Sequence, residues 1–226
     1  MGELGDSDQH PILSREPSLG HPTLIVKSSS DYTKLELVDE GLKILAAIDK
    51  PVAVVVVIGP YRSGKSFLLN QLLGVGCDKG FGVGHQRHAQ TKGIWLWSQP
   101  QIVHGRAVFY VDTEGFESTG KAAVYDDRIF ALSTLFSSLL VYNLPETVRE
   151  ADISKLSFAV ELAREFSGRG QNSHFQMPHL MWLIQRDFLE GQSITSMVDA
   201  ALKPVANPDR NPVSYTHLTL PTSFLV

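Results

Sequence analysis

The apolar positions of this 226-residue chain fall into short runs whose period changes along the sequence. Val52–Ile58 is a continuous run of small and β-branched apolar residues, which is typical of a strand buried on both faces. Residues 67–73 follow with apolar side chains at helical spacing and end before Gly74 and Gly76. The pattern therefore predicts a buried central strand that leads through a short loop into a helix.

The same criteria predict further elements on both sides of this unit. Strands are predicted at 23–27, 93–97, 107–111, 139–143 and His179–Ile184, and helices at 38–48, 126–136 and 147–166. We interpret 93–97 and 107–111 as a hairpin, and 78–92 as a loop too long to be an idle connection. Apolar runs that alternate with helices predict an α/β fold, in which a doubly wound, mainly parallel sheet has helices on both faces. Ligands of such folds bind at the carboxyl ends of the strands.

The loop between the central strand and its helix carries the most specific chemistry. Gly59–Ser66 fits the pattern G-x-x-x-x-G-K-[ST] of a P-loop NTPase, with a strand before it and a helix after it as the motif requires. Gly59 and Gly64 permit a tight loop whose N–H groups point at a phosphate, and the helix adds its positive end. Lys65 is expected to reach the β- and γ-phosphates and Ser66 to bind Mg²⁺. The alternative is a Gly-rich turn that matches by chance, and the correct flanks favour the P-loop.

Two later segments follow in the order of a nucleotide site. Asp112 ends the strand 107–111, where a carboxylate can hold Mg²⁺ through water, and Gly115 can bring its N–H to a γ-phosphate. Thr91, at the end of the long loop, can supply a second metal ligand when a triphosphate is bound. The alternatives are a common turn at 112–115 and an exposed loop threonine, and the order of the three segments favours the nucleotide site.

Two arginines and an aspartate leave alternatives open. Asp187 follows the strand His179–Ile184, and its carboxylate can accept from N1–H and the N2 amino group of guanine, which adenine lacks. The sequence has no N-K-x-D signature there, so Arg186 and Asp187 are equally compatible with a surface ion pair. Arg62 lies inside the P-loop and is either an arginine finger supplied in cis or an exposed partner of a nearby carboxylate.

Taken together, these motifs resemble the guanylate-binding protein family of large, dynamin-related GTPases. The residues that carry the resemblance are Gly59–Ser66, Gln90-Thr91-Lys92-Gly93-Ile94-Trp95-Leu96-Trp97, Asp112-Thr113-Glu114-Gly115 and Arg186-Asp187-Phe188. The resemblance runs from about Leu35 to Phe188, and atlastins are the runner-up within this class. It implies GTP as substrate, Mg²⁺ as cofactor, hydrolysis to GDP (with GMP in some members), and homodimers formed through the GTPase domains when nucleotide is bound.

The resemblance also assigns roles to individual residues. Arg62 matches the internal finger, Asp112 the acid on the metal side, and Glu114 a residue that orders the water network. The residues expected to contact the nucleotide are Gly59, Tyr61, Arg62, Ser63, Gly64, Lys65, Ser66, Phe67, Thr91, Asp112, Gly115, Arg186 and Asp187. Of these, Ser66, Thr91 and Asp112 would hold Mg²⁺, and Arg62, Lys65 and Thr91 would serve catalysis together with Glu114.

The chain departs from the family pattern in three respects. Ala89 stands where the family often has a serine that positions the attacking water, which affects the expected rate of hydrolysis and not binding. Ile184-Gln185 precedes the Arg-Asp pair in place of the usual Thr-Leu, a change that we expect to be tolerated. We expect the closing strand, guanine cap and helical domain of the family to lie outside this sequence, which we interpret as truncated. A GTP-controlled interaction module with slow hydrolysis is therefore retained as an alternative to a GTPase, and a non-nucleotide α/β domain as a remote third.

Composition and chain organisation complete the interpretation. The net charge of −4 gives no overall basic footprint, so nucleic acid is not indicated as a partner. Cys77 is the only cysteine, the N-terminus is acidic and unlike a secretory signal, and no apolar run approaches the roughly 18 residues of a membrane span. We therefore expect a cytoplasmic protein, with membrane association left open. We expect residues 1–21 to form a mobile leader, 22–211 a GTPase domain truncated at its C-terminal side, and 212–226 a non-native, cloning-derived tail.

Overall fold

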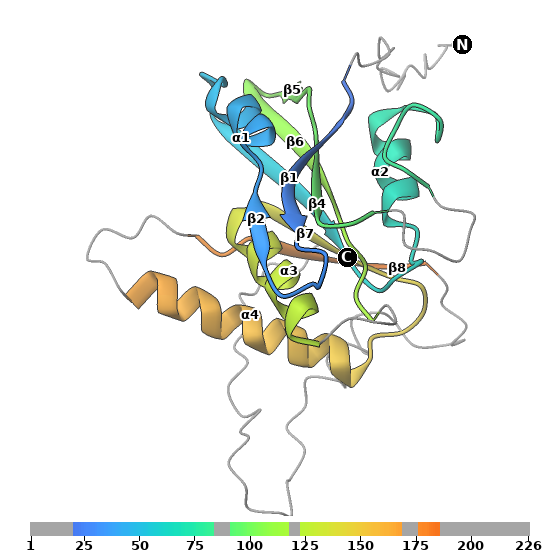
Figure 1. Cartoon of the computed structure of the whole chain (residues 1–226), viewed down its shortest axis with the longest axis vertical. Helices are drawn as coiled ribbons and strands as arrows, with labels where there is room; N and C mark the ends of the chain where they lie inside the picture. The colour runs from blue at the N-terminus through green and yellow to red at the C-terminus, as the bar shows by residue number, and fades with distance from the viewer. Residues whose placement is uncertain (1–19, 84–90, 118–122, 169–175, 186–226) are drawn as a thin grey trace, which may run out of the picture.

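The computed structural model describes residues 20–83, 91–117, 123–168 and 176–185 (Figure 1). These residues form one mixed sheet of eight strands and four helices. In chain order the elements are β1 (Pro22–Ser28), β2 (Leu35–Leu37), α1 (Asp39–Ala46), β3 (Val52–Ile58), α2 (Lys65–Leu73), β4 (Ile94–Trp97), β5 (Gln101–Val103), β6 (Arg106–Thr113), α3 (Ala123–Phe136), β7 (Leu139–Leu144), α4 (Glu150–Gly168) and β8 (His179–Ile184).

The sheet has a parallel half built around β3. Its strand order is β2-β1-β4-β6-β3-β7-β8, and β5 pairs with β6 beside this path. β3 runs parallel to β6 on one side and to β7 on the other, and β8 extends the parallel half beyond β7. β4, β1, β2 and β5 form antiparallel pairs. The chain reaches β6 and β7 on opposite sides of β3, which is the arrangement that opens a ligand crevice at the carboxyl end of the central strand.

Alternate side chains of β3 pack against helices on opposite faces of the sheet. Val56 and Ile58 belong to the core cluster that lies under α3 and α4. Val57 points to the other face and packs in a second cluster with Leu69 and Leu73 of α2. Figure 1 shows α2 set apart from α3 and α4 in the same way. The predicted α/β fold with helices on both faces is therefore confirmed, and burial on both faces explains why β3 is apolar throughout.

The two shortest strands, β2 and β5, were not among the predicted elements. β4 and β6 do pair in antiparallel fashion, as the predicted hairpin requires, but β5 forms within the segment that connects them. The chain turns from β5 to β6 through His104 and Gly105, whose φ angles are 47° and 78°. Two successive positive φ angles are characteristic of a two-residue hairpin turn.

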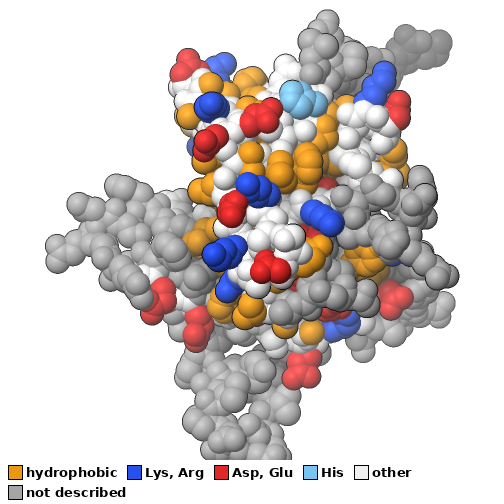
Figure 2. All heavy atoms as spheres, in the orientation of Figure 1, with side chains coloured by type: hydrophobic (Ala, Val, Ile, Leu, Met, Phe, Trp, Pro, Cys, Tyr) orange, Lys and Arg blue, Asp and Glu red, His pale blue; other side chains and the backbone are white. Residues whose placement is uncertain are grey.

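One face of the described part of the chain carries mixed charge. Figure 2 shows acidic and basic side chains interspersed with apolar ones on the face in view. None of the helices that the structure describes combines the length and the apolar character needed to cross a membrane.

Candidate functional site

The P-loop turns sharply away from the end of β3 because glycines occupy its two special positions. Gly59 has φ 147°, and a Cβ atom there would lie 2.2 Å from the carbonyl oxygen of Asn143 on β7. Gly64 has φ 82° and caps α2 without a side-chain hydrogen bond. Gly64 has no side chain to cap α2, and a helix N-terminus of this kind can present its N–H groups and its positive dipole end to an anion.

Two side chains from neighbouring strands hold the backbone of the P-loop. Asn143, fully buried at the end of β7, donates through Nδ2 to the carbonyl oxygen of Ser63 at 2.7 Å. Gln185, directly after β8, donates to the same oxygen and, at 2.7 Å, to Oδ1 of Asn143. Sequence reasoning assigned no role to Asn143 or Gln185. The available signal was a single amide in the otherwise apolar run 139–144, since a buried amide must find partners.

The three predicted metal ligands lie together at the carboxyl end of the parallel strands. Ser66 Oγ, on α2, donates to Oδ2 of Asp112 at 2.6 Å, and Thr91 Oγ1 donates to the same oxygen at 3.2 Å. The two hydroxyl oxygens are 3.4 Å apart. Oδ1 of Asp112 is buried and has no hydrogen-bond partner among the described residues. The cluster is thus an all-oxygen donor set with unused capacity, which is the kind of site that hard divalent cations take.

Burial and charge act against each other at this cluster. Burial raises the pKa of Asp112 above its ordinary value, while the positive charge of Lys65 and the hydrogen bonds from Ser66 and Thr91 oppose the rise. Lys65 is itself buried and donates from Nζ to the carbonyl oxygen of Pro60 at 3.0 Å. A buried acid and a buried amine on adjacent elements create a strongly polar site inside an apolar core.

The loop after β6 is joined to the P-loop through the backbone. The N–H of Tyr61 donates to the carbonyl oxygen of Phe116 at 2.8 Å, and the N–H of Phe116 donates to that of Gly59 at 3.2 Å. A Cβ atom on Gly115 would lie 2.5 Å from Cα of Tyr61 and 3.0 Å from Nζ of Lys65. Only glycine allows the two loops to approach this closely, so the predicted phosphate-sensing Gly115 lies directly against the P-loop.

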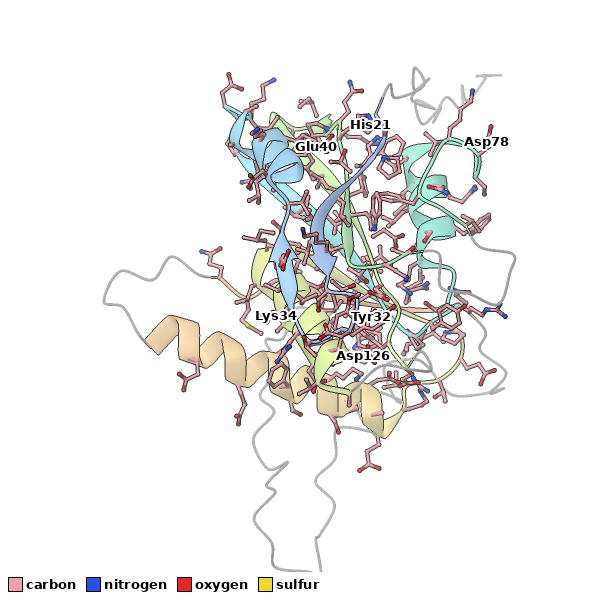
Figure 3. All side chains as sticks on the ribbon, in the orientation of Figure 1. His21, Tyr32, Lys34, Glu40, Asp78 and Asp126 are labelled. Carbon is pink, nitrogen blue, oxygen red and sulfur yellow. The ribbon has the colours of Figure 1, made fainter. Side chains whose placement is uncertain are left out.

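Glu114 connects this loop to the segment that carries Thr91. Its Oε2 accepts from the N–H of Gly93 at 2.8 Å and from the hydroxyl of Tyr125, on α3, at 2.6 Å. The pKa of Tyr125 is raised by burial and by this hydrogen bond. The Tyr125 ring contacts Tyr32 edge-on, with centroids 5.1 Å apart, and Figure 3 shows Tyr32 close to α3. Sequence reasoning missed Tyr125, because nothing in a helical pattern indicates which tyrosine meets a buried acid.

The remaining predicted residues differ in how much the structure says of them. Arg62 has φ 63°, and its guanidinium lies over the Tyr61 ring, 5.5 Å from the centroid. The Phe67 side chain is exposed on α2. Arg186, Asp187 and Ala89 lie outside the described residues, as do 1–19 and 212–226.

A cavity of about 320 Å³ adjoins the oxygen cluster. Among the described residues, Thr91 and Asp112 supply polar lining, and Pro22, Phe81, Gly82 and Trp95 line the cavity beside them. A hollow that is apolar apart from a few convergent polar groups is the usual form of a small-molecule site.

Comparison with known proteins agrees with this geometry. Residues 32–194 match the family model described as guanylate-binding protein, N-terminal domain. The chain is 34% identical over 201 residues to guanylate-binding protein 1 of Chlorocebus aethiops, covering 81% of this chain and 33% of that protein. It is 32% identical over 217 residues to guanylate-binding protein 5 of Homo sapiens, covering 88% of this chain and 36% of that protein.

One solved structure with partial similarity is a crystal structure of Toc33 from Arabidopsis thaliana, a dimerization-deficient mutant. It shares 16% identity, and the match covers 72% of this chain and 65% of that chain. Its TM-score of 0.43 is too low for this likeness to carry an argument. The chain spans about a third of the length of the curated relatives that it matches. On the extent of the family match, the chain belongs to the guanylate-binding protein family, within the N-terminal domain of that family.

Proposed function

We propose that this chain binds GTP together with Mg²⁺ and hydrolyses the γ-phosphate, as a GTPase of the guanylate-binding type. The observation that carries the proposal is the convergence of Ser66, Thr91 and Asp112. Ser66 lies on α2, Thr91 in the segment before β4, and Asp112 on β6. The three meet beside Lys65 and Gly115. A sequence that matched the P-loop pattern by chance would not place Thr91, 25 residues away, so that it hydrogen-bonds the same carboxylate as Ser66.

The residues of the chain divide the work of binding a triphosphate. Backbone N–H groups of the P-loop and of the start of α2 would surround the β-phosphate, and Lys65 would exchange its bond to Pro60 for phosphate oxygens. A magnesium ion held by Ser66, Thr91 and Asp112 would neutralise charge on the β- and γ-phosphates. Gly115 would offer its N–H to the γ-phosphate, because its backbone already lies against Lys65 and Tyr61.

Arg62 and Asp187 are proposed for rate and base selection. Arg62 is on the exposed side of the P-loop, so its guanidinium can leave the Tyr61 ring for the bridging oxygen of the scissile bond. Asp187 is two residues beyond Gln185, which contacts the P-loop, and its carboxylate would accept from guanine. We further propose that nucleotide-bound chains form homodimers through this domain.

A second candidate is a GTP-controlled interaction module that hydrolyses slowly. The observation that favours it is Ala89, which replaces the serine expected to position the attacking water. Both candidates require tight GTP binding, and they differ only in turnover.

The decisive experiment measures nucleotide binding and phosphate release by the purified 226-residue chain in excess Mg²⁺. The GTPase proposal expects release of phosphate from GTP and not from ATP, whereas binding without release would favour the interaction module. Lys65→Ala should abolish GTP binding while the circular dichroism spectrum stays that of the wild type. GTP binding that survives Lys65→Ala would overturn both candidates.

Two variants separate the roles of the finger and the base reader. Arg62→Ala should lower kcat far more than it raises KM, since a finger acts in the transition state. Equal losses in both would make Arg62 a binding residue. Asp187→Asn should weaken GTP and leave the weak binding of ATP unchanged, and an equal loss for both nucleotides would remove it from base selection. Size-exclusion chromatography with a non-hydrolysable GTP analogue tests the dimer, and a monomer under all nucleotides would contradict it.

A further inference from the structure

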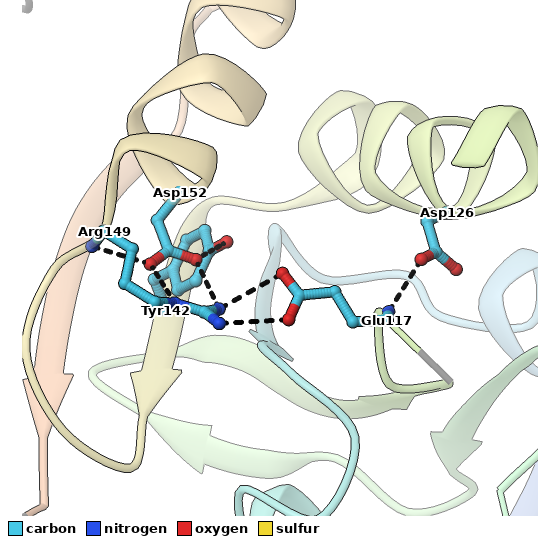
Figure 4. A network of polar contacts seen from close by, with 5 residues as sticks. All are labelled: Glu117, Asp126, Tyr142, Arg149 and Asp152. Atoms are coloured by element: carbon cyan, nitrogen blue, oxygen red, sulfur yellow. Dashed lines mark hydrogen bonds and ion pairs between the residues drawn. The ribbon is translucent and has the colours of Figure 1, made fainter. Parts of the chain in front are cut away.

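A polar network joins the loop after β6 to the beginning of α4 (Figure 4). Its central residue is Arg149, which directly precedes α4. The guanidinium donates to both carboxylate oxygens of Glu117, from NH1 to Oε2 at 3.0 Å and from NH2 to Oε1 at 3.2 Å. It also donates from Nε to Oδ2 of Asp152 at 3.2 Å. One side chain thus connects an exposed acid on the loop with a buried acid on the helix.

Asp152 fixes the position of Arg149 from within the core. It is fully buried, and besides the guanidinium it accepts from the Arg149 N–H at 2.9 Å and from the Tyr142 hydroxyl at 2.9 Å. The pKa of Tyr142 is raised by burial and by Asp152, and that of Arg149 is raised chiefly by its hydrogen bond to Asp152. A buried carboxylate that receives three kinds of donor is a rigid anchor, in contrast to a solvated surface pair.

Glu117 needs such an anchor because its backbone is in an unfavourable conformation. Its φ angle is 62°, in the left-handed region that non-glycine residues rarely adopt. Two contacts stabilise this conformation. The N–H of Glu117 donates to Oδ2 of Asp126, on α3, at 2.8 Å, and its carboxylate is held by Arg149. Strain of this kind persists only where the surroundings fix the conformation, and it occurs preferentially at functional loops.

The neighbouring residues of the loop face the proposed nucleotide site. Phe116 exchanges backbone hydrogen bonds with Gly59 and Tyr61 of the P-loop, and Gly115 lies against Lys65. Gly115 directly precedes Phe116, whose backbone is bonded to the P-loop, and Glu117 directly follows it. A change at Glu117 therefore alters the direction in which the Gly115 N–H points, since the loop has no slack between these bonds.

We infer that Arg149 is a positioning residue for γ-phosphate recognition, which holds residues 114–117 in their observed geometry through Glu117. The inference rests on the proposed function, and it adds a link between α4 and the phosphate-sensing loop. In the proposed binding mode Gly115 meets only the γ-phosphate, so we expect this link to matter for GTP binding and turnover and not for GDP binding.

The test compares Arg149→Gln and Glu117→Gln in the full 226-residue chain. Glu117→Gln removes the ion pair while the buried bond between Arg149 and Asp152 stays, so it avoids a destabilised core. The matched control is Lys27→Gln, which breaks the ion pair between Lys27 and Glu36, 3.0 Å long and similarly exposed, on the β1–β2 pair. Amide hydrogen exchange of residues 113–117 is measured without nucleotide. Binding of GDP and of a non-hydrolysable GTP analogue, and kcat for GTP, are measured in parallel.

Arg149→Gln and Glu117→Gln should each speed amide hydrogen exchange at residues 113–117. Each should lower kcat about tenfold and the affinity for the GTP analogue by a similar factor. The affinity for GDP should stay within about twofold of that of the wild type. The double variant should be no worse than the more affected single variant, because both act through one pair. Exchange and kcat indistinguishable from Lys27→Gln would overturn the inference while leaving the GTPase proposal standing. Equal losses for GDP and for the GTP analogue would also overturn it. A wild-type chain that binds no GTP would instead overturn the proposed function, and this role of Arg149 with it.

Discussion

Asn143 offers a quantitative test of how β7 supports the P-loop. Asn143→Ala removes two hydrogen bonds of the buried amide, the one to the Ser63 carbonyl and the one from Gln185, each 2.7 Å long. A net contribution of about 0.5–1.5 kcal/mol per bond gives a loss of about 1–3 kcal/mol in the free energy of unfolding. Each kcal/mol lowers the Tm of a domain of this size by roughly 2–4 °C.

The functional part of the prediction concerns phosphate binding. The Ser63 carbonyl fixes the plane of the peptide that precedes Gly64, so its release loosens the loop that surrounds the phosphate. We expect GDP affinity, followed with a fluorescent GDP analogue, to fall by about tenfold or more, which corresponds to about 1.4 kcal/mol. Urea unfolding of the same samples measures the loss in the free energy of unfolding.

The control for this experiment is Asn70→Ala. Asn70 is equally buried, lies on α2, and makes two hydrogen bonds of similar length to the backbone of Phe81, at 2.9 and 2.7 Å. It should cost similar stability and leave GDP affinity near that of the wild type. If Asn143→Ala and Asn70→Ala change GDP affinity equally, the loss is one of general stability, and the argument that Asn143 orients the P-loop is refuted.

Three further outcomes follow from the site and its surroundings. Asp112→Asn should raise the Tm of the nucleotide-free chain and weaken Mg²⁺-dependent GTP binding. Burial raises the pKa of Asp112 in the folded state, so its ionised carboxylate destabilises the fold at neutral pH. The stability of the wild type therefore rises as the pH falls through that pKa. In thermal melts the variant should lack this rise of Tm toward low pH. Gly115→Ala should weaken a GTP analogue about tenfold more than GDP in binding titrations, because the new Cβ would meet Cα of Tyr61. The pKa of Asp31 is lowered from 3.8 to about 2 by hydrogen bonds from Ser29 and Thr33, so its stabilising effect is present above pH 3.8 and is lost as the pH falls toward 2. Carbon-detected NMR titration should find the low value, and a pKa near 3.8 would contradict the turn geometry.

Local chemistry made part of this molecule predictable from sequence. The P-loop is specified by four fixed positions within eight consecutive residues, Gly59–Ser66, and its glycines adopt positive φ angles. Ser66, Thr91 and Asp112 were predicted to share one metal site from the order of their three motifs along the chain, and their side chains lie together. β3 and β8 have the predicted bounds, because a continuous apolar run between polar residues leaves little ambiguity.

Tertiary contacts decided the rest. α4 begins at Glu150, three residues later than predicted. The Asp152 carboxylate accepts the N–H of Arg149, which is one of the two hydrogen bonds of a capping box and sets the start of the helix at this point. β2 and β5 have three residues each, which is too short for a period of two to show. Tyr125 acquires its role only through contact with an acid 11 residues away in sequence, on another element.

The isolated bridge between Pro60 and Phe116 has a consequence for the thermodynamics of ligand capture. It continues the parallel pairing of β3 and β6 beyond the ends of both strands, so contacts within the chain itself tie the P-loop to the loop after β6. Part of the conformational entropy of ordering these two loops is therefore lost when the chain folds. A ligand then has less backbone to order on binding, which favours its affinity.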